Sequence, residues 1–338
     1  MKVVTFGEIM LRLAPKGYNR FFQDDILGAT FGGGEANVAV SLANYGVDSY
    51  FVTKLPNHDI GEAAIRELNY YGVNTSNVAR GGERVGIYFL EKGASQRPSK
   101  VIYDRKYSSI SQAQFDDFNW ISIFKDTDWF HFTGITPALS DDLALITLDA
   151  LRTAKRMGVK VSCDLNYRTK LWSTKRANEV MTEFMQYVDV LIANEEDAEN
   201  VFGIKSDLTN VSSGELNREG YVDVAKQLKE KFKFEKVAIT LRESLNANEN
   251  NWSALLYDEQ AFFSPVYNLN IVDRVGGGDS FCGGLIYALL QDFESEDAVN
   301  FAVAASALKH SVEGDFNRVS VVEVENLMNG DTTGRVQR

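Results

Sequence analysis

Short runs of β-branched and other apolar residues alternate with segments of helical periodicity along most of this 338-residue chain. Parallel strands need long crossover connections, which helices usually supply. The alternation therefore predicts an α/β fold with a mainly parallel sheet covered by helices on both faces. The expected strands lie near residues 3–8, 49–55, 129–134, 159–164, 188–193 and 236–241, and the expected helices near 35–45, 59–71, 140–157, 175–186, 194–202, 218–232, 279–290 and 295–311.

Two segments break this alternation. Residues 10–33 and 84–111 have the pattern of antiparallel strands with loops and lack the helices that a parallel sheet requires. We expect them to form a small β lid, and the polar stretch 243–251 to be a surface loop. The tail 331–338 is expected to be disordered. The remaining residues would form the α/β core, which then comprises 1–9, 34–83 and 112–330.

The charge balance limits the partners of the protein. There are 35 basic and 47 acidic residues, a formal net charge of −12, which argues against broad binding to nucleic acid or anionic membranes. No apolar run approaches the roughly 18 residues of a membrane span, and we expect a cytoplasmic protein. An anionic ligand would therefore need a local cluster of positive groups.

Three consecutive glycines, Gly276 to Gly278, lead directly into Asp279 and an apolar helical pattern. Free backbone N–H groups and the positive end of the helix dipole make such a helix start an anion site. Neither a dinucleotide-binding fingerprint nor a P-loop is present. The glycine turn is therefore predicted to bind a phosphate group without either of these two motifs.

A glycine turn that carries a carboxylate suits transfer of a phosphoryl group to a hydroxyl. The amides of Gly276, Gly277 and Gly278 would stabilise charge on the moving phosphoryl group, while Asp279 orients the acceptor hydroxyl and takes its proton. The helix N-terminus is expected to lower the pKa of Asp279. A plain helix N-cap is the alternative interpretation of this aspartate.

Polar side chains follow several predicted strands at the points where the strands end. In parallel sheets ligands bind beyond these carboxyl ends. Any one of these residues could be a helix cap or a turn former, but together they predict a site. They are Asp164, Asn166, Arg168, Asn194, Thr240 and Arg242.

Two separated motifs resemble the signatures of the ribokinase-like (PfkB) family of carbohydrate kinases. They are "FGGGEANVAVSLANYG" and "DRVGGGDSFCGGLIYAL". The resemblance covers essentially the whole chain and implies a three-layer ribokinase-like core with a β lid, ATP and Mg²⁺ as cofactors, and a homodimer or higher homo-oligomer formed through the lid. It implies that Gly33, Gly34 and Asn37 line the sugar pocket and that Asp279 is the base. The residues implied to lie along ATP are Asn166, Arg168, Asn194, Thr240, Arg242, Gly276 and Gly278.

Two positions bear on metal ions. The Asn-x-x-Glu motif of the family corresponds to Asn194 to Asp197 here. An aspartate, which has a shorter side chain, therefore replaces the glutamate that the family associates with magnesium. Asp273 resembles a position near a monovalent cation in the family. The resemblance therefore implies Mg²⁺ near Asp197 and K⁺ near Asp273.

Within the family, "GIYFLE", "VIYDRKYSS" and "CDLNYRTKLW" resemble the 2-keto-3-deoxygluconate kinases. A period of two places Tyr103, Arg105 and Tyr107 on one strand face. Arg105 and Arg168 offer planar forks for a sugar-acid carboxylate or a phosphate. Tyr88 and Tyr103 could hydrogen-bond the sugar oxygens, and Asp315 is expected to close the pocket. The hypothesis is ATP-dependent phosphorylation of the 6-hydroxyl of 2-keto-3-deoxygluconate.

Alternatives remain open at this stage. A kinase of the same fold could act on fructose, tagatose or the epimer 2-keto-3-deoxygalactonate, because one hydrogen bond can decide between epimers. A non-catalytic sugar-binding sensor could keep the pocket without the chemistry. Asp279 beside an intact glycine turn argues against the sensor, which has no need of a base.

Overall fold

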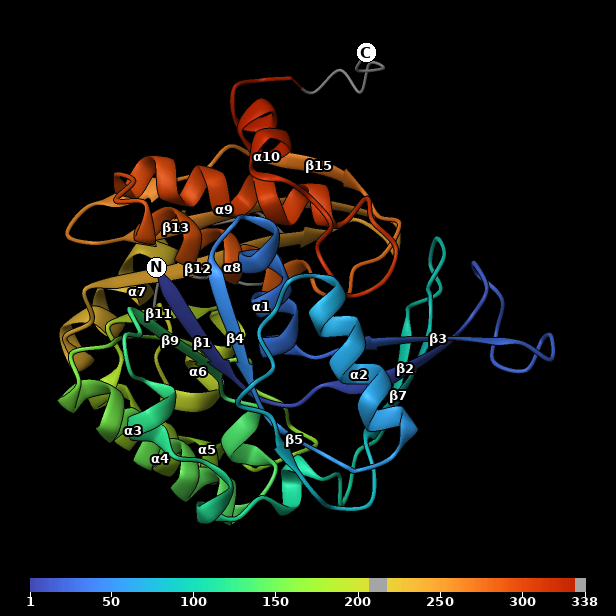
Figure 1. The fold of residues 1–338 in the computed structure, drawn as a ribbon. Helices are drawn as coiled ribbons and strands as arrows, with labels where there is room; N and C mark the ends of the chain where they lie inside the picture. Colours follow the sequence, from blue (N-terminus) through green and yellow to red (C-terminus); the bar gives the residue numbers. More distant parts are fainter. Residues whose placement is uncertain (207–217, 332–338) are drawn as a thin grey trace.

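The computed structural model describes residues 1–206 and 218–331, which form a central sheet between helical layers and a smaller sheet to one side (Figure 1). The central sheet has nine strands in the order β14-β13-β12-β11-β10-β9-β1-β4, with β15 also paired to β13. These strands are β1 (Lys2–Phe6), β4 (Asp48–Val52), β9 (Trp129–Thr133), β10 (Lys160–Asp164), β11 (Val190–Ala193), β12 (Lys236–Ser244), β13 (Glu249–Tyr257), β14 (Ala261–Phe263) and β15 (Tyr267–Asn270).

The six predicted core strands all lie in the parallel part of this sheet. Parallel pairing joins β4, β1, β9, β10, β11 and β12 in that spatial order. The prediction of a surface loop at 243–251 is wrong, because β12 continues to Ser244 and pairs antiparallel with β13. These polar residues satisfy their backbone groups in a hairpin, with Ser244 opposite Asn250. Polar composition alone did not reveal the pairing.

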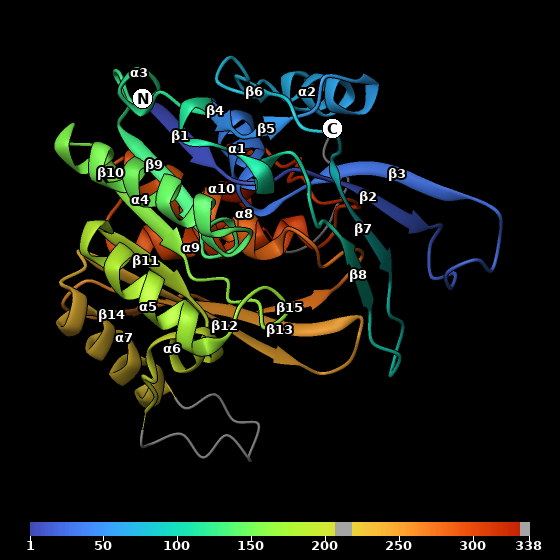
Figure 2. The ribbon, with the colours of Figure 1, turned by 90° about the horizontal axis from the view of Figure 1, so that it is seen from below.

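Helices cover both faces of the sheet (Figure 2). Successive side chains of β1 point to opposite faces of the sheet, so Val4 and Phe6 lie in one hydrophobic core and Val3 lies in the other. The first core lies under α3 to α7, and the second under α1, α8, α9 and α10. The helices are α1 (Gly34–Asn44), α2 (Asp59–Tyr70), α3 (Trp120–Ile123), α4 (Asp141–Arg156), α5 (Thr174–Phe184), α6 (Glu195–Phe202), α7 (Arg218–Phe232), α8 (Gly277–Leu290), α9 (Ser295–Lys309) and α10 (Val321–Met328).

The smaller sheet projects from the core, as Figure 1 shows, and lies in the two segments that break the alternation. Its order is β3-β2-β7-β8, with antiparallel pairing of β2 with β3 and of β7 with β8. The two hairpins meet through a parallel β2–β7 pair, which was not expected because hairpin signals reveal only neighbours in sequence. The strands are β2 (Met10–Pro15), β3 (Leu27–Gly32), β7 (Gly86–Glu91) and β8 (Lys100–Asp104).

A short third sheet joins β5 (Lys54–Leu55) to β6 (Ala79–Arg80). Within residues 1–206 and 218–331, no helix is both long and apolar enough to cross a membrane. Apart from Asp331, the predicted tail 331–338 lies outside the described residues.

Candidate active site

One cavity of about 670 Å³ opens at the carboxyl ends of the parallel strands, between the core and the small sheet. Its wall includes the start of α8 and residues from both signature motifs. All the site residues predicted from the sequence except Asp273 line it: Gly33, Gly34, Asn37, Tyr88, Tyr103, Arg105, Asp164, Asn166, Arg168, Asn194, Asp197, Thr240, Arg242, Gly276, Gly277, Gly278, Asp279 and Asp315.

The first residue of the glycine turn has a conformation and an environment that only glycine fits. Gly276 is the N-cap of α8 with φ of +83°, and a Cβ there would stand 2.0 Å from the Asp315 carbonyl oxygen. Gly278 is exposed, and no atom lies within 4 Å of the place its Cβ would take. The Gly277 amide donates to the Arg274 carbonyl at 3.3 Å. The first-turn amide of Gly278, which has no intrahelical acceptor, is therefore the donor most open to an anion.

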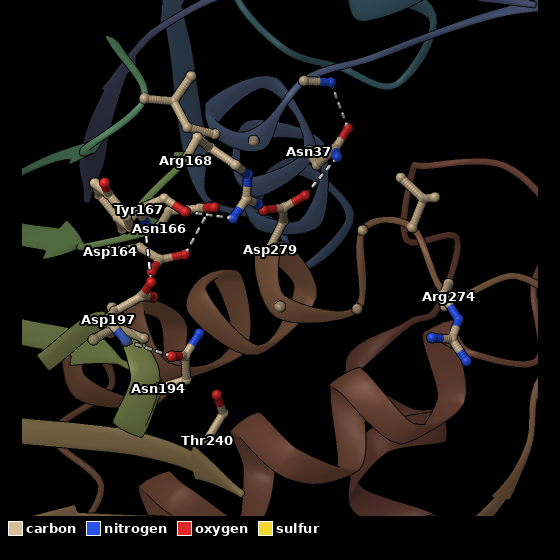
Figure 3. A pocket seen from close by; sticks show the side chains of 18 of the residues that line it. Asn37, Asp164, Asn166, Tyr167, Arg168, Asn194, Asp197, Thr240, Arg274 and Asp279 are labelled. Carbon is tan, nitrogen blue, oxygen red and sulfur yellow. Dashed lines mark hydrogen bonds between the residues drawn. The ribbon is translucent and has the colours of Figure 1, made fainter. Parts of the chain in front are cut away.

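Asp279 lies in the first turn of α8 and is not its N-cap, so the cap interpretation is wrong. Its Oδ2 accepts a 2.6 Å hydrogen bond from Asn37 Nδ2. Asn37 Oδ1 in turn accepts from the Gly33 amide at 3.2 Å. Figure 3 shows Asn37 and Asp279 pointing toward one another. The two signature motifs, far apart in sequence, thus meet at this carboxylate.

Burial decides the pKa of Asp279. Desolvation raises this pKa to about 7, and the hydrogen bond from Asn37 offsets only part of the rise. The expectation that the helix N-terminus would lower the pKa is therefore wrong. A carboxylate with a pKa near neutrality is a stronger proton acceptor than an exposed aspartate.

This pKa predicts a pH dependence. Below about pH 7 the Asp279 carboxyl gains a proton and can no longer accept one, so kcat/KM for phosphoryl transfer should fall about tenfold per pH unit. Measuring kcat/KM as a function of pH tests for this decrease, because kcat/KM reports the ionisation of the free enzyme. The residual activity of Asp279→Asn should lack it, and a flat profile between about pH 5 and 7 would contradict the assignment.

The small sheet supplies one wall of the cavity. Tyr88 and Tyr103 face each other across the β7–β8 pair, with ring centroids 6.1 Å apart. Arg105 follows β8, and its guanidinium lies over the Tyr103 ring at 5.5 Å. The predicted alternation ends with the strand at Asp104, so Tyr107 does not join this wall and is 62% exposed.

Arg105 already has a partner that the sequence did not predict. Its Nε donates to Glu8 Oε2 at 2.7 Å, and Nη2 contacts the same oxygen. Glu8 is buried, and its Oε1 has no hydrogen-bond partner within the part of the chain that the structure describes. Glu8 follows the first strand, so its position at a strand end was an available signal. The Glu8 carboxylate holds one edge of the Arg105 guanidinium on the cavity wall.

The opposite part of the cavity lies at the ends of β10 and β11. Asn166 has a left-handed φ of +40°, and its Nδ2 donates to Asp164 Oδ2 at 3.2 Å. Strained backbone of this kind often occurs at functional sites. Asp197 accepts the Tyr167 amide at 3.1 Å and donates its own amide to Asn194 Oδ1 at 2.8 Å. Figure 3 shows these side chains beside Arg168.

Burial shifts the pKa values of two carboxyl groups in this part of the cavity. Desolvation, with repulsion from Asp197 and Asp279, raises the pKa of Asp164 to about 8. Desolvation also raises the pKa of Asp197 to about 6 against the attraction of Arg168. Within the described ranges there is no cluster of three or more His, Cys, Asp or Glu that could hold a metal by itself. Mg²⁺ commonly takes one or two carboxylates together with substrate phosphates, and Asp164 and Asp197 fit that requirement.

A buried ion-pair network lies behind the glycine turn. Arg12 donates from Nη2 to Asp273 at 2.5 Å and from Nη1 to Asp315 at 2.7 Å. The Tyr88 hydroxyl donates to Asp315 at 2.7 Å. The Asp315 carboxylate is thus engaged by Arg12 and Tyr88 although the residue lines the cavity, and Asp273 lies behind the wall. Nothing in the alternation of "MLRLAP" indicated that Arg12 is buried.

Comparison with known proteins places this site in a family. A profile of the pfkB family of carbohydrate kinases matches residues 1–319. The chain belongs to that family. The protein is therefore a carbohydrate kinase, a phosphotransferase that uses an alcohol group as acceptor, and the expected ribokinase-like fold is confirmed.

Individual relatives share nearly the whole chain. The crystal structure of a 2-dehydro-3-deoxygluconokinase from Thermotoga maritima is 54% identical, covers 98% of both chains and has a TM-score of 0.94. A 2-dehydro-3-deoxygalactonokinase from Haloferax volcanii is 32% identical over 98% of both chains. A 2-dehydro-3-deoxygluconokinase from Thermoproteus tenax is 26% identical over 93% of this chain and 90% of its own.

Proposed function

We propose that this kinase phosphorylates the 6-hydroxyl of 2-keto-3-deoxygluconate, also called 2-dehydro-3-deoxygluconate, with ATP as donor. The observation that carries the proposal is the place of Asp279. This carboxylate lines the same cavity as the open amide of Gly278 and the wall formed by Tyr103 and Arg105, and it accepts a hydrogen bond from Asn37. The Thermotoga and Thermoproteus relatives, named for this substrate, support the choice of sugar.

In the proposed reaction Asp279 acts on the sugar. Its carboxylate accepts a hydrogen bond from the 6-hydroxyl and orients that oxygen toward the γ-phosphoryl group of ATP. It takes the proton as the new O–P bond forms and the bond from the γ-phosphorus to the β,γ-bridging oxygen breaks, which releases ADP. Asn37 fixes the carboxylate through its 2.6 Å hydrogen bond. The open amide of Gly278 stabilises the charge on the phosphoryl oxygens, whereas the Gly277 amide already donates to the Arg274 carbonyl.

ATP and magnesium fit the other part of the cavity. Asp197 and Asp164 would hold Mg²⁺ together with the ATP phosphates, and the ion would neutralise charge on those phosphates. The exposed guanidinium of Arg168 donates to the Tyr167 carbonyl at 3.1 Å and keeps further N–H groups for phosphate. The residues proposed to lie along ATP are Asn166, Arg168, Asn194, Thr240, Arg242, Gly276 and Gly278.

The sugar acid fits the wall of the small sheet. Arg105 presents its free guanidinium edge to the substrate carboxylate, and Tyr103 offers a hydroxyl to the sugar oxygens. Gly33, Gly34 and Asn37 provide the floor, where Gly33 is required because a Cβ would stand 1.9 Å from the Glu8 carbonyl oxygen. Tyr88 and Asp315 complete this side of the cavity.

An ATP-coupled assay across sugars tests the proposal. The panel comprises 2-keto-3-deoxygluconate, its galactonate epimer, fructose and tagatose. We expect the highest kcat/KM for the gluconate compound, with both neutral ketoses far behind because they lack the carboxylate. Faster turnover of fructose or tagatose than of either acid would refute the substrate class.

The galactonate epimer is the second candidate. The Haloferax relative named for that substrate matches this chain over nearly its whole length. The two acids share the carboxylate and the 6-hydroxyl, so Arg105 and Asp279 would serve both. A higher kcat/KM for the epimer in the same panel would select this second function.

Substitution of Arg105 tests whether this residue recognises the carboxylate of the sugar acid. In Arg105→Lys a point charge replaces a planar fork, so the KM for the sugar acid should rise about 10-fold or more while the KM for ATP changes little. Steady-state kinetics with each substrate varied measure both constants. An effect confined to ATP would move Arg105 to the nucleotide.

We also propose that two copies of the chain associate through the small sheet. Large apolar side chains are exposed on its strands and connecting segments: Tyr18 (50%), Phe22 (82%), Ile26 (71%) and Ile102 (52%). Such an exposed apolar surface is typical of an interaction site.

Light scattering should give the mass of a dimer, and the Phe22→Asp variant should have a mass closer to that of the monomer. A wild-type protein that is monomeric at assay concentration would contradict the proposed dimer.

A further inference from the structure

Lys309 is a buried lysine directly behind the glycine turn. It is the last residue of α9, its relative exposure is 0%, and its Nζ donates to the carbonyl oxygens of Asp273 at 3.3 Å and Val312 at 3.2 Å. A Cβ on Gly276 would stand 3.3 Å from Lys309 Cε, so the side chain packs against the turn itself. An ammonium group is rarely buried this way unless it is paired or hydrogen-bonded.

The charges around Lys309 balance without an added ion. Arg12 and Lys309 are the cations, Asp273 and Asp315 are the anions that act on Lys309 most strongly, and Asp279, which is hydrogen-bonded to Asn37, acts on it more weakly. The Asp273 carboxylate accepts from Arg12 and from the amides of Val275 and Gly314. A potassium ion near Asp273 would stand beside two cations with no unpaired anion, so the residues present do not fit the K⁺ expected from the sequence.

We propose that the Lys309 ammonium is a fixed internal cation that takes the place of a monovalent metal ion beneath the phosphate-binding turn. Ammonium and potassium carry the same charge, and backbone carbonyls bind both. The ammonium joins the Asp273 carbonyl, just before the turn, to the Val312 carbonyl in the segment after α9, and so positions Gly276. It also adds a positive charge behind the amides that face the phosphoryl group. Lys309 is a positioning residue and does not contact the substrate.

The first test measures how the rate of the reaction depends on the cation in solution. It rests on the proposed function, because the assay uses the sugar acid as substrate. Wild-type kcat should be the same in tetramethylammonium chloride as in KCl at about 0.1 M, where screening is equal. Lys309→Ala removes the cation and opens space, and its kcat should fall about 10- to 100-fold in tetramethylammonium chloride. KCl or NH₄Cl should restore most of the loss. Lys309→Met, which fills the space without charge, should lose kcat and show no rescue.

The second test does not depend on the reaction. A cation that binds the folded Lys309→Ala protein should raise its melting temperature by about 2 °C or more in KCl or NH₄Cl relative to tetramethylammonium chloride. The wild-type protein and Lys309→Met should melt at the same temperature in each salt. If the alanine variant folds only in KCl or NH₄Cl, the proposal is supported, and if it fails to fold in every salt, the proposal is wrong.

Lys229 provides the matched control. Its Nζ donates to the carbonyls of Phe234 at 3.0 Å and Glu235 at 2.8 Å, at the end of α7 and outside the cavity wall. Lys229→Ala should keep wild-type kcat and show no dependence on K⁺. Activation of the wild-type enzyme by K⁺, an unchanged kcat in Lys309→Ala, or a loss that neither ion restores would overturn the proposal. A wild type inactive on sugar acids would refute the proposed function and leave the melting test standing.

Discussion

Replacing Asp279 with asparagine is expected to lower kcat by about 10²- to 10⁴-fold, with the Kd for nucleotide little changed. The amide keeps the size of the side chain and a hydrogen bond with Asn37, but it cannot take a proton from the sugar hydroxyl. Steady-state kinetics give kcat, and nucleotide titration gives the Kd.

Stability separates this effect from misfolding. Because burial raises the pKa of Asp279 to about 7, above its value in the unfolded chain, ionisation of Asp279 destabilises the folded state, and above about pH 7 this loss of stability is complete. The neutral asparagine should therefore melt at the same or a higher temperature than wild type at pH 8 or so. A variant with nearly normal kcat would show that the base is another residue.

Arg12→Met is expected to cause the largest loss of stability. It leaves Asp273 and Asp315 buried without their shared cation, and breaking a buried pair in this way costs about 3–5 kcal/mol. Denaturant unfolding measures the loss in the free energy of unfolding. Because Asp315 contacts the glycine turn, kcat should fall as well.

Arg152 gives the matched control for an exposed ion pair. It bonds Glu183 at 3.0 Å, and the two side chains are 52% and 48% exposed. Arg152→Met should cost no more than about 1 kcal/mol. Equal losses for the Arg12 and Arg152 variants would contradict the role given to the buried network.

The local pattern of apolar residues predicted the helices and strands of the core well, because the strands of the parallel sheet are continuous apolar runs. The strands around Val4, Phe130 and Leu191 are buried on both faces, and such runs are visible in sequence. The glycine turn was equally visible because Gly276 needs a left-handed φ and close packing. The meeting of both signature motifs at one site was implied by the family resemblance, and the structure brings their residues together.

What the sequence could not supply is the pairing of distant charged residues. Arg12 meets Asp315, which lies 303 residues away, and Arg105 meets Glu8, 97 residues away. A polar residue in an alternating strand is usually solvent-exposed, so Arg12 gave no sign of burial. The pKa of Asp279 was mispredicted for a related reason. The helix end is a local feature, but the burial that outweighs it depends on the whole fold.

A crystal structure of the enzyme with 2-keto-3-deoxygluconate and a non-hydrolysable ATP analogue tests the central assignment most directly. We predict the sugar 6-hydroxyl within hydrogen-bond distance of Asp279, about 3 Å, and the γ-phosphate on the amide of Gly278. A γ-phosphate bound away from the Gly276 to Gly278 turn, or a different hydroxyl at Asp279, would contradict the account.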